Sequence, residues 1–120
     1  MSLTVVVVED HVEAAQGLGE LIEMWGHRAH VAYDGESGLE LVQAVRPDVA
    51  LVDIGLPVMD GDALAAKIRD LEIGRGMYLV ALTGYRDAEA VSAHFDRRLE
   101  KPVPLEVLEH LLAERAAPER

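Results

Sequence analysis

The segment VALVDIGLPVMDG occupies residues 49–61 and holds three local patterns one after another. Residues 49–52 are an apolar run rich in valine, which is typical of a strand buried on both faces. Asp53 ends this run, and the glycine and proline that follow it indicate a loop. Asp60 and Gly61 then indicate the start of a helix. The segment therefore predicts one unit of strand, loop and helix, with an acidic side chain at the end of the strand.

The same order of strand and helix continues on both sides of this segment. Short apolar or β-branched runs predict strands at residues 4–8, 28–32, 49–52, 78–82 and 98–100. Apolar residues spaced three or four apart predict helices at about residues 12–25, 36–45, 61–71, 87–93 and 105–112. Strands that alternate with helices in this way predict an α/β fold, in which a doubly wound parallel sheet of five strands carries helices on both faces.

The composition indicates a single domain that spans residues 1–120. Half of the 120 residues are hydrophobic, at 50%, and the chain has no cysteine. This content is enough for one core without disulfides, and the lack of cysteine excludes thiolate metal sites and fits a reducing compartment. No apolar run approaches the ~20 residues that cross a bilayer. We therefore expect a protein of the cytoplasm that does not insert into membranes.

The net charge limits the possible partners. At −11 the chain would repel phosphate backbones, so we expect no direct binding to nucleic acid. A dinucleotide site is the natural alternative for this kind of sheet, but it needs a glycine-rich turn after the first strand. Glu9, Asp10 and His11 occupy that turn instead. Because two carboxylates there would repel a pyrophosphate, the sequence disfavours a dinucleotide-binding protein.

Reactive side chains follow four of the five predicted strands: Glu9 and Asp10, Asp53, Thr83, and Lys101. Because the carboxyl ends of parallel strands meet at one edge of the sheet, we expect these residues to converge where ligands bind. Three clustered carboxylates repel one another, and one ammonium group cannot neutralise all of them. Oxygen-only ligands favour a hard cation, and Mg²⁺ is usually held by one or two carboxylates and water. The sequence therefore predicts a magnesium site.

Four segments in this order resemble the receiver domain of bacterial two-component response regulators. The phosphorylation loop of that family is matched by Asp53–Gly61, and its acidic first-strand motif by Val6–Asp10. Its fourth-strand motif is matched by Ala81–Gly84, and its lysine–proline motif by Leu99–Val103. The similarity covers nearly the whole chain. The resemblance implies a flavodoxin-like sheet with strand order 2-1-3-4-5 and a cis peptide bond before Pro102.

The resemblance also implies the roles of individual residues. Asp53 would accept a phosphoryl group from a histidine kinase or a histidine phosphotransfer protein. Mg²⁺ would be held by Glu9, Asp10, Asp53 and the carbonyl of Gly55. Lys101 and Thr83 would bind the phosphoryl oxygens, and a shift of Thr83 would change the surface offered to partners. The chain would thus be a phosphoprotein of signal transduction that assists its own phosphorylation and dephosphorylation, rather than a turnover enzyme.

Two departures from the family pattern affect the predicted output surface. Arg98 lies three positions before Lys101, where most receivers have an aromatic residue that turns inward. Since the burial of a guanidinium group in an apolar pocket costs free energy, we expect Arg98 to stay exposed to solvent and to contribute to a partner surface. Thr83 and Lys101 are 18 positions apart, which is fewer than usual by about one helical turn. We therefore expect a short fourth helix and an altered output surface.

Three alternatives remain open at this stage. The altered surface would also suit a receiver that binds proteins without being phosphorylated. A Mg²⁺-dependent hydrolase with Asp53 as nucleophile is less favoured, because haloacid-dehalogenase-type enzymes carry a second aspartate where Gly55 lies. The strings around Asp53 and Thr83 resemble receivers of hybrid sensor histidine kinases, so one domain of a larger kinase is a further possibility.

Overall fold

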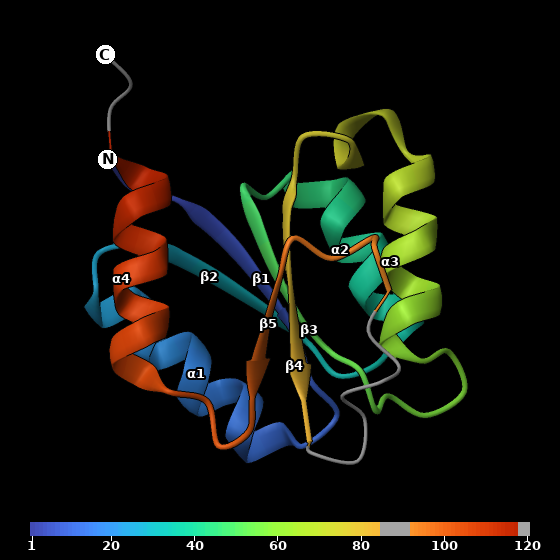
Figure 1. The fold of residues 1–120 in the computed structure, drawn as a ribbon, viewed down its shortest axis with the longest axis horizontal. Helices are drawn as coiled ribbons and strands as arrows, with labels where there is room; N and C mark the ends of the chain where they lie inside the picture. The colour runs from blue at the N-terminus through green and yellow to red at the C-terminus, as the bar shows by residue number, and fades with distance from the viewer. Residues whose placement is uncertain (85–91, 118–120) are drawn as a thin grey trace.

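A parallel sheet of five strands forms the centre of the structure, a computed structural model that describes residues 1–84 and 92–117 (Figure 1). The strands are β1 (Thr4–Val8), β2 (Arg28–Ala32), β3 (Val49–Asp53), β4 (Tyr78–Thr83) and β5 (Arg97–Glu100). They are ordered β2-β1-β3-β4-β5, and every neighbouring pair is parallel. The predicted fold class and strand order are therefore confirmed, with three strands longer by one residue than expected.

Helices cover both faces of this sheet. They are α1 (Val12–Met24), α2 (Gly35–Val45), α3 (Gly61–Asp70) and α4 (Leu105–Ala116), with a 3₁₀ turn at Glu72–Gly74. In Figure 1, α2 and α3 lie on one face of the sheet, and α1 and α4 lie on the other. The helix predicted at residues 87–93 falls mostly outside the described residues. In the part of the chain that the structure describes, no helix is long and apolar enough to span a membrane.

The valine run of β1 shows why a strand without polar alternation suits this architecture. Successive side chains of a strand point to opposite faces of the sheet. Val6 and Val8 therefore join the core beneath α2 and α3, whereas Val5 and Val7 join the core beneath α1 and α4. All four valines are completely buried. Because helices cover both faces of the sheet, every side chain of the strand is buried, and an uninterrupted run of β-branched apolar residues is favourable there.

The start of α3 is held close to the end of β3, and this places the loop between them. Asp60 caps the helix, since its side chain accepts a hydrogen bond of 2.8 Å from the amide of Ala63. At Gly61, a Cβ atom would lie 2.3 Å from the carbonyl oxygen of Asp53, which is far too close for any side chain. Glycine is therefore required there, and α3 begins directly against the end of β3.

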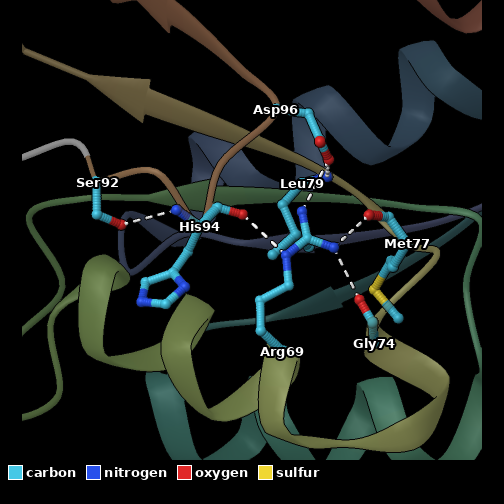
Figure 2. A network of polar contacts seen from close by, with 7 residues as sticks. All are labelled: Arg69, Gly74, Met77, Leu79, Ser92, His94 and Asp96. Atoms are coloured by element: carbon cyan, nitrogen blue, oxygen red, sulfur yellow. Dashed lines mark hydrogen bonds and ion pairs between the residues drawn. The ribbon is translucent and has the colours of Figure 1, made fainter.

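Arg69, in the last turn of α3, connects three segments at the opposite edge of the sheet. Figure 2 shows its guanidinium group donating to three main-chain carbonyls, those of Gly74, Met77 and His94, at 2.7–2.9 Å. It also pairs with the Asp96 carboxylate at 2.8 Å, and the same carboxylate oxygen accepts a bond of 2.8 Å from the amide of Leu79. The segment that enters β5 is thereby fixed to both α3 and β4.

Candidate metal and phosphoacceptor site

Four neighbouring strands bring the predicted site residues to one edge of the sheet. Glu9 directly follows β1, Asp53 ends β3, Thr83 ends β4 and Lys101 directly follows β5. The register pairs Asp53 with Leu82 and Thr83 with Glu100, so the ends of β3, β4 and β5 lie nearly level. The convergence expected from the sequence is therefore present in the structure.

Three carboxylates form a tight acidic cluster at this edge. Glu9, Asp10 and Asp53 each offer one carboxylate oxygen within 4.8 Å of those of the other two. Glu9 and Asp53 are both only 5% exposed, whereas Asp10 is exposed. At such distances the like charges repel, and burial reduces the screening by water. The cluster therefore favours the binding of positive charge.

Lys101 supplies one such charge and contacts both buried carboxylates. Its Nζ atom lies 2.5 Å from Oε1 of Glu9 and 3.2 Å from Oδ2 of Asp53. The side chain of Lys101 is one-third exposed, at 33%, while the two carboxylates are nearly covered. The ammonium group thus reaches the site from its solvent side and lies within contact distance of the proposed acceptor.

The pKa values of this pair reflect both burial and mutual attraction. Burial is the largest influence on Glu9 and raises the pKa of its carboxyl group, although the hydrogen bond from Lys101 acts in the opposite direction. For Lys101, burial is again the largest single influence and by itself lowers the pKa, but the bond to Glu9 and the charge of Asp53 outweigh it and raise the pKa overall. Lys101 is therefore protonated at neutral pH.

Backbone amides hold the other oxygen of each buried carboxylate. The amide of His11 donates to Oε2 of Glu9 at 3.0 Å, and the amide of Gly55 donates to Oδ1 of Asp53 at 3.0 Å. Each carboxylate therefore uses one oxygen for the backbone and the other for Lys101. This division fixes the orientation of both groups before any ligand arrives.

Thr83 ends β4 with a hydroxyl group that is buried. The residue is completely buried, and its Oγ1 atom has no hydrogen-bond partner among the described residues. Its main-chain oxygen accepts a bond of 2.7 Å from the amide of Lys101, which places the two residues side by side. A buried polar atom without a partner is unfavourable, so this hydroxyl keeps an unused capacity for a hydrogen bond.

The donor atoms present fit a magnesium ion. All the candidate ligands are oxygens, and two of the three carboxylates are prearranged by backbone hydrogen bonds. Hard oxygen ligands, few in number and open to water on one side, are what Mg²⁺ prefers. Asp10 is the exposed member of the cluster, so water can reach the site on its side.

Sequence reasoning did not identify one contributor to the site, His11, and one structural residue at the opposite edge of the sheet, Arg69. The amide of His11 orients Glu9, and the Nδ1 atom of His11 caps α1 by accepting a bond of 3.1 Å from the amide of Ala14. A histidine cap has no strong sequence signature, since Ser, Thr, Asp and Asn are the usual caps. Arg69 was also missed, because its partners are reached only after the chain has folded.

The departures from the family pattern are partly visible in the structure. Arg98 is exposed on β5, so its predicted outward placement is confirmed. The peptide bond between Lys101 and Pro102 is cis, as the resemblance implied. The short fourth helix predicted at residues 87–93 lies mostly outside the described part of the chain.

Comparisons with known proteins point to the same family. Residues 5–113 match the response regulator receiver domain. The chain is 36% identical over 110 residues to a cyclic di-GMP phosphodiesterase of Thermotoga maritima, and 32% identical over 115 residues to the autoinducer 1 sensor kinase/phosphatase LuxN of Vibrio campbellii. These alignments cover 88% and 92% of this chain but only 29% and 13% of the two relatives.

A solved structure with the same fold also shows a metal in the corresponding kind of domain. The receiver domain of the sensor histidine kinase PA1611 from Pseudomonas aeruginosa has a TM-score of 0.87 and 27% identity, covering 95% of this chain and 97% of that one. That structure holds a magnesium ion in its active-site cleft. The family match, the relatives and this fold agree, and the chain belongs to the response regulator receiver domains of two-component signalling.

Proposed function

We propose that residues 1–120 form a single phosphoacceptor receiver domain in a two-component phosphorelay. In this proposal Asp53 takes a phosphoryl group from a phosphohistidine donor in the presence of Mg²⁺, and the modified domain changes its protein–protein interactions. The observation that carries the proposal is the contact of 3.2 Å between Lys101 Nζ and Asp53 Oδ2 beside two further carboxylates. The donor is a histidine kinase or a histidine phosphotransfer protein.

The transfer is an exchange of one bond to phosphorus for another. A carboxylate oxygen of Asp53 attacks the phosphorus atom, the P–N bond of the phosphohistidine breaks, and its electron pair returns to the imidazole nitrogen. The product is an acyl phosphate on Asp53. The Gly55 amide holds the carboxylate still during this exchange, because it bonds Oδ1 at 3.0 Å. The chemistry therefore depends mainly on position and charge.

The residues around Asp53 would stabilise the transferred group. Glu9, Asp10, Asp53 and the carbonyl of Gly55 would hold Mg²⁺, which when bound supplies positive charge near the phosphoryl oxygens. Lys101 would leave its contact with Asp53 and pair with one of these oxygens. The Thr83 hydroxyl, which is buried and has no partner among the described residues, would donate to another. A shift of Thr83 toward the phosphoryl group would then change the surface that the domain offers to its partners.

A second candidate function is favoured by one observation. Arg98 is exposed at the position where most receivers couple an inward-turning aromatic residue to the threonine. A receiver without that coupling could act as a protein-binding domain whose signal does not depend on phosphate. In that case Asp53 would keep its place in the fold, but its modification would not alter partner affinity.

Intact-mass measurement after incubation with Mg²⁺ and acetyl phosphate separates these proposals. We expect the addition of one phosphoryl group to the unchanged chain and none to Asp53→Asn. The asparagine variant keeps the size of the side chain but removes the nucleophilic carboxylate. Failure of the unchanged chain to gain a phosphoryl group would support the phosphate-independent receiver instead, and continuous release of phosphate from a specific ester would support a hydrolase.

We further propose that the domain acts in the cytoplasm and acts on other proteins rather than directly on nucleic acid. The net charge of −11 supports the second point, because it opposes contact with a polyanion. The downstream partner would instead be a protein that recognises the surface near β5. Comparison of partner affinity before and after labelling of Asp53 tests this part of the proposal.

A further inference from the structure

Val58 lies in an unfavourable backbone conformation in the loop between β3 and α3. Its φ angle is +67°, in the left-handed region, and the amide of Met59 donates to the carbonyl of Pro57 at 2.8 Å across it. The three residues therefore form a tight γ-turn of the rare, strained kind. A β-branched residue is among the least suited to this conformation, because its Cβ substituents crowd the backbone. Glycine or asparagine would fit with less strain.

No packing among the described residues compensates for this strain. The side chain of Val58 is fully exposed, at 110% of the reference area. In contrast, the next residue faces inward: Met59 is partly buried and packs against the core beneath α2 and α3. It lies so close to Gly35 that a Cβ atom there would meet Met59 atoms at 3.0 Å. Met59 thus anchors the loop and leaves Val58 projecting into solvent.

The loop lies where a phosphoryl donor must approach. It leaves the sheet at Asp53, and Figure 1 shows it at the same edge as the ends of β3 and β4. Asp53 is only 5% exposed, so a protein that delivers a phosphoryl group must come into contact with the loops around it. The loop that carries Val58 begins at the acceptor itself, and its exposed apolar tip is available to that protein.

The surface beside Val58 indicates the chemistry of such a partner. A surface cavity of about 380 Å³ is lined by Pro57, Val58 and Met59 of the loop and by residues of the first turns of α2. Its other side carries three acidic residues, Asp34, Glu36 and Glu40. A complementary protein would therefore present an apolar recess with lysine or arginine beside it.

We infer that Val58 is a specificity-determining contact for the protein that donates the phosphoryl group. In the complex, the valine side chain leaves water and enters an apolar recess of the donor, which offsets the strain that the free domain carries. The inference rests on the proposed phosphoacceptor function. It adds a residue that governs recognition by a protein donor and has no part in the chemistry at Asp53.

Two substitutions separate strain from contact. Val58→Asn suits a left-handed backbone and replaces the apolar branches by an amide, so we expect a melting temperature a few degrees higher than that of the unchanged chain. Labelling by acetyl phosphate should stay within about twofold, whereas transfer from a protein donor should slow by about tenfold or more. Val58→Leu keeps an apolar side chain, so it should retain most of the rate of phosphoryl transfer from the protein donor.

The protein donor in this experiment is the phosphorylated catalytic core of the histidine kinase that labels the unchanged chain fastest among a purified set. Met24→Gln is the matched control, because Met24 is 79% exposed at the end of α1, at the opposite edge of the sheet. It should leave both rates unchanged. Equal transfer rates for Val58→Asn and the unchanged chain would overturn the inference, and so would an equal loss in Met24→Gln. Lack of labelling by acetyl phosphate in the unchanged chain would instead count against the proposed function.

Discussion

Two buried carboxylates share one ammonium group in this site, and a third carboxylate lies beside them. Lys101 bonds Glu9 and Asp53 at the same time, so the cluster keeps a negative excess even when the lysine is charged. Burial is the main reason that the pKa of Glu9 is raised, and the nearby charge of Asp53 raises it further, while the hydrogen bond from Lys101 lowers it. At the scale of single residues, the negative charge of the cluster therefore exceeds the positive charge of Lys101, and this excess favours the binding of a cation.

Asp10→Ala should stabilise the metal-free domain. Removal of an exposed carboxylate within 4.8 Å of two others relieves repulsion without leaving a buried cavity. We expect the melting temperature without metal to rise by about 2–4 °C, and the affinity for Mg²⁺ to fall by about tenfold or more. Thermal denaturation with and without MgCl₂ measures both effects. A lower melting temperature in the metal-free variant would show that Asp10 has a structural role instead.

His27 should make the stability of the domain depend on pH. Its Nδ1 atom accepts a bond of 3.1 Å from the amide of Leu3, which requires the neutral ring, and burial together with the nearby amino terminus lowers the pKa of the imidazole. The unfolded chain binds a proton near pH 6.5, whereas the folded chain does so only at lower pH. Stability should therefore fall as the pH drops from about 6.5 to the lowered pKa.

Urea denaturation at several pH values tests this expectation for His27. His27→Gln can still accept the bond from Leu3 but does not titrate, so its stability should change less between pH 7 and pH 5 than that of the unchanged chain. His94→Gln is the control, since the His94 side chain is exposed and only its main chain contributes to the Arg69 network. The same pH dependence in His27→Gln and the unchanged chain would contradict the assignment.

At the scale of secondary-structure elements, Arg69 joins several segments at the amino edge of the sheet, as Lys101 joins the ends of β1 and β3 at the carboxyl edge. It joins the end of α3 to the segments that lead into β4 and β5 (Figure 2). The short connection from β4 to β5 is thus fixed at its far end, where Asp96 also bonds the main chain of Leu79.

Arg69→Met should therefore destabilise the whole domain. The variant keeps an unbranched apolar stem but removes the hydrogen bonds that Arg69 donates to three carbonyls and to the Asp96 carboxylate. We expect a loss of about 2–3 kcal/mol in the free energy of unfolding, since Asp96 is partly exposed and keeps its bond from Leu79. Lys67→Met removes the same charge from an exposed position of α3 and should change stability by less than about 0.5 kcal/mol. Equal effects of the two variants in urea denaturation would show that charge, and not the network, matters.

At the scale of the whole molecule, the altered spacing before β5 should change how two domains associate. Thr83 and Lys101 are 18 positions apart, and Arg98 lies exposed on the strand between them. Many receivers form symmetric dimers through their fourth helix, fifth strand and last helix. We expect the phosphorylated domain not to form that dimer, because the shortened connection and the arginine change the shape and charge of this surface.

Small-angle scattering before and after labelling with acetyl phosphate measures this association. The scattering mass should remain that of a monomer, 13.1 kDa, at concentrations where other receivers dimerise. Asp53→Asn, which cannot be labelled, provides the unphosphorylated reference. A symmetric dimer that appears only after labelling and buries Arg98 would contradict the expectation.

Most of the fold could be predicted because its information is local. The valine run of β1 and the apolar run of β3 specify buried strands wherever they occur, and Gly26, Pro47 and Asp60 mark helix ends without reference to the rest of the chain. The order of the strands came instead from the resemblance to a family, since patterns along the chain do not say which strands pair.

The chain's own patterns thus determined its five strands, the four α-helices of the described residues, and the acidic and basic residues at the ends of the strands. Tertiary folding decided the contacts among them, because those contacts join distant positions: Lys101 and Glu9 are 92 residues apart, and Arg69 and Asp96 are 27 apart. A hydrogen bond forms only when donor and acceptor are brought within about 3 Å. That proximity arises from the register and twist of the assembled sheet, which no short segment encodes.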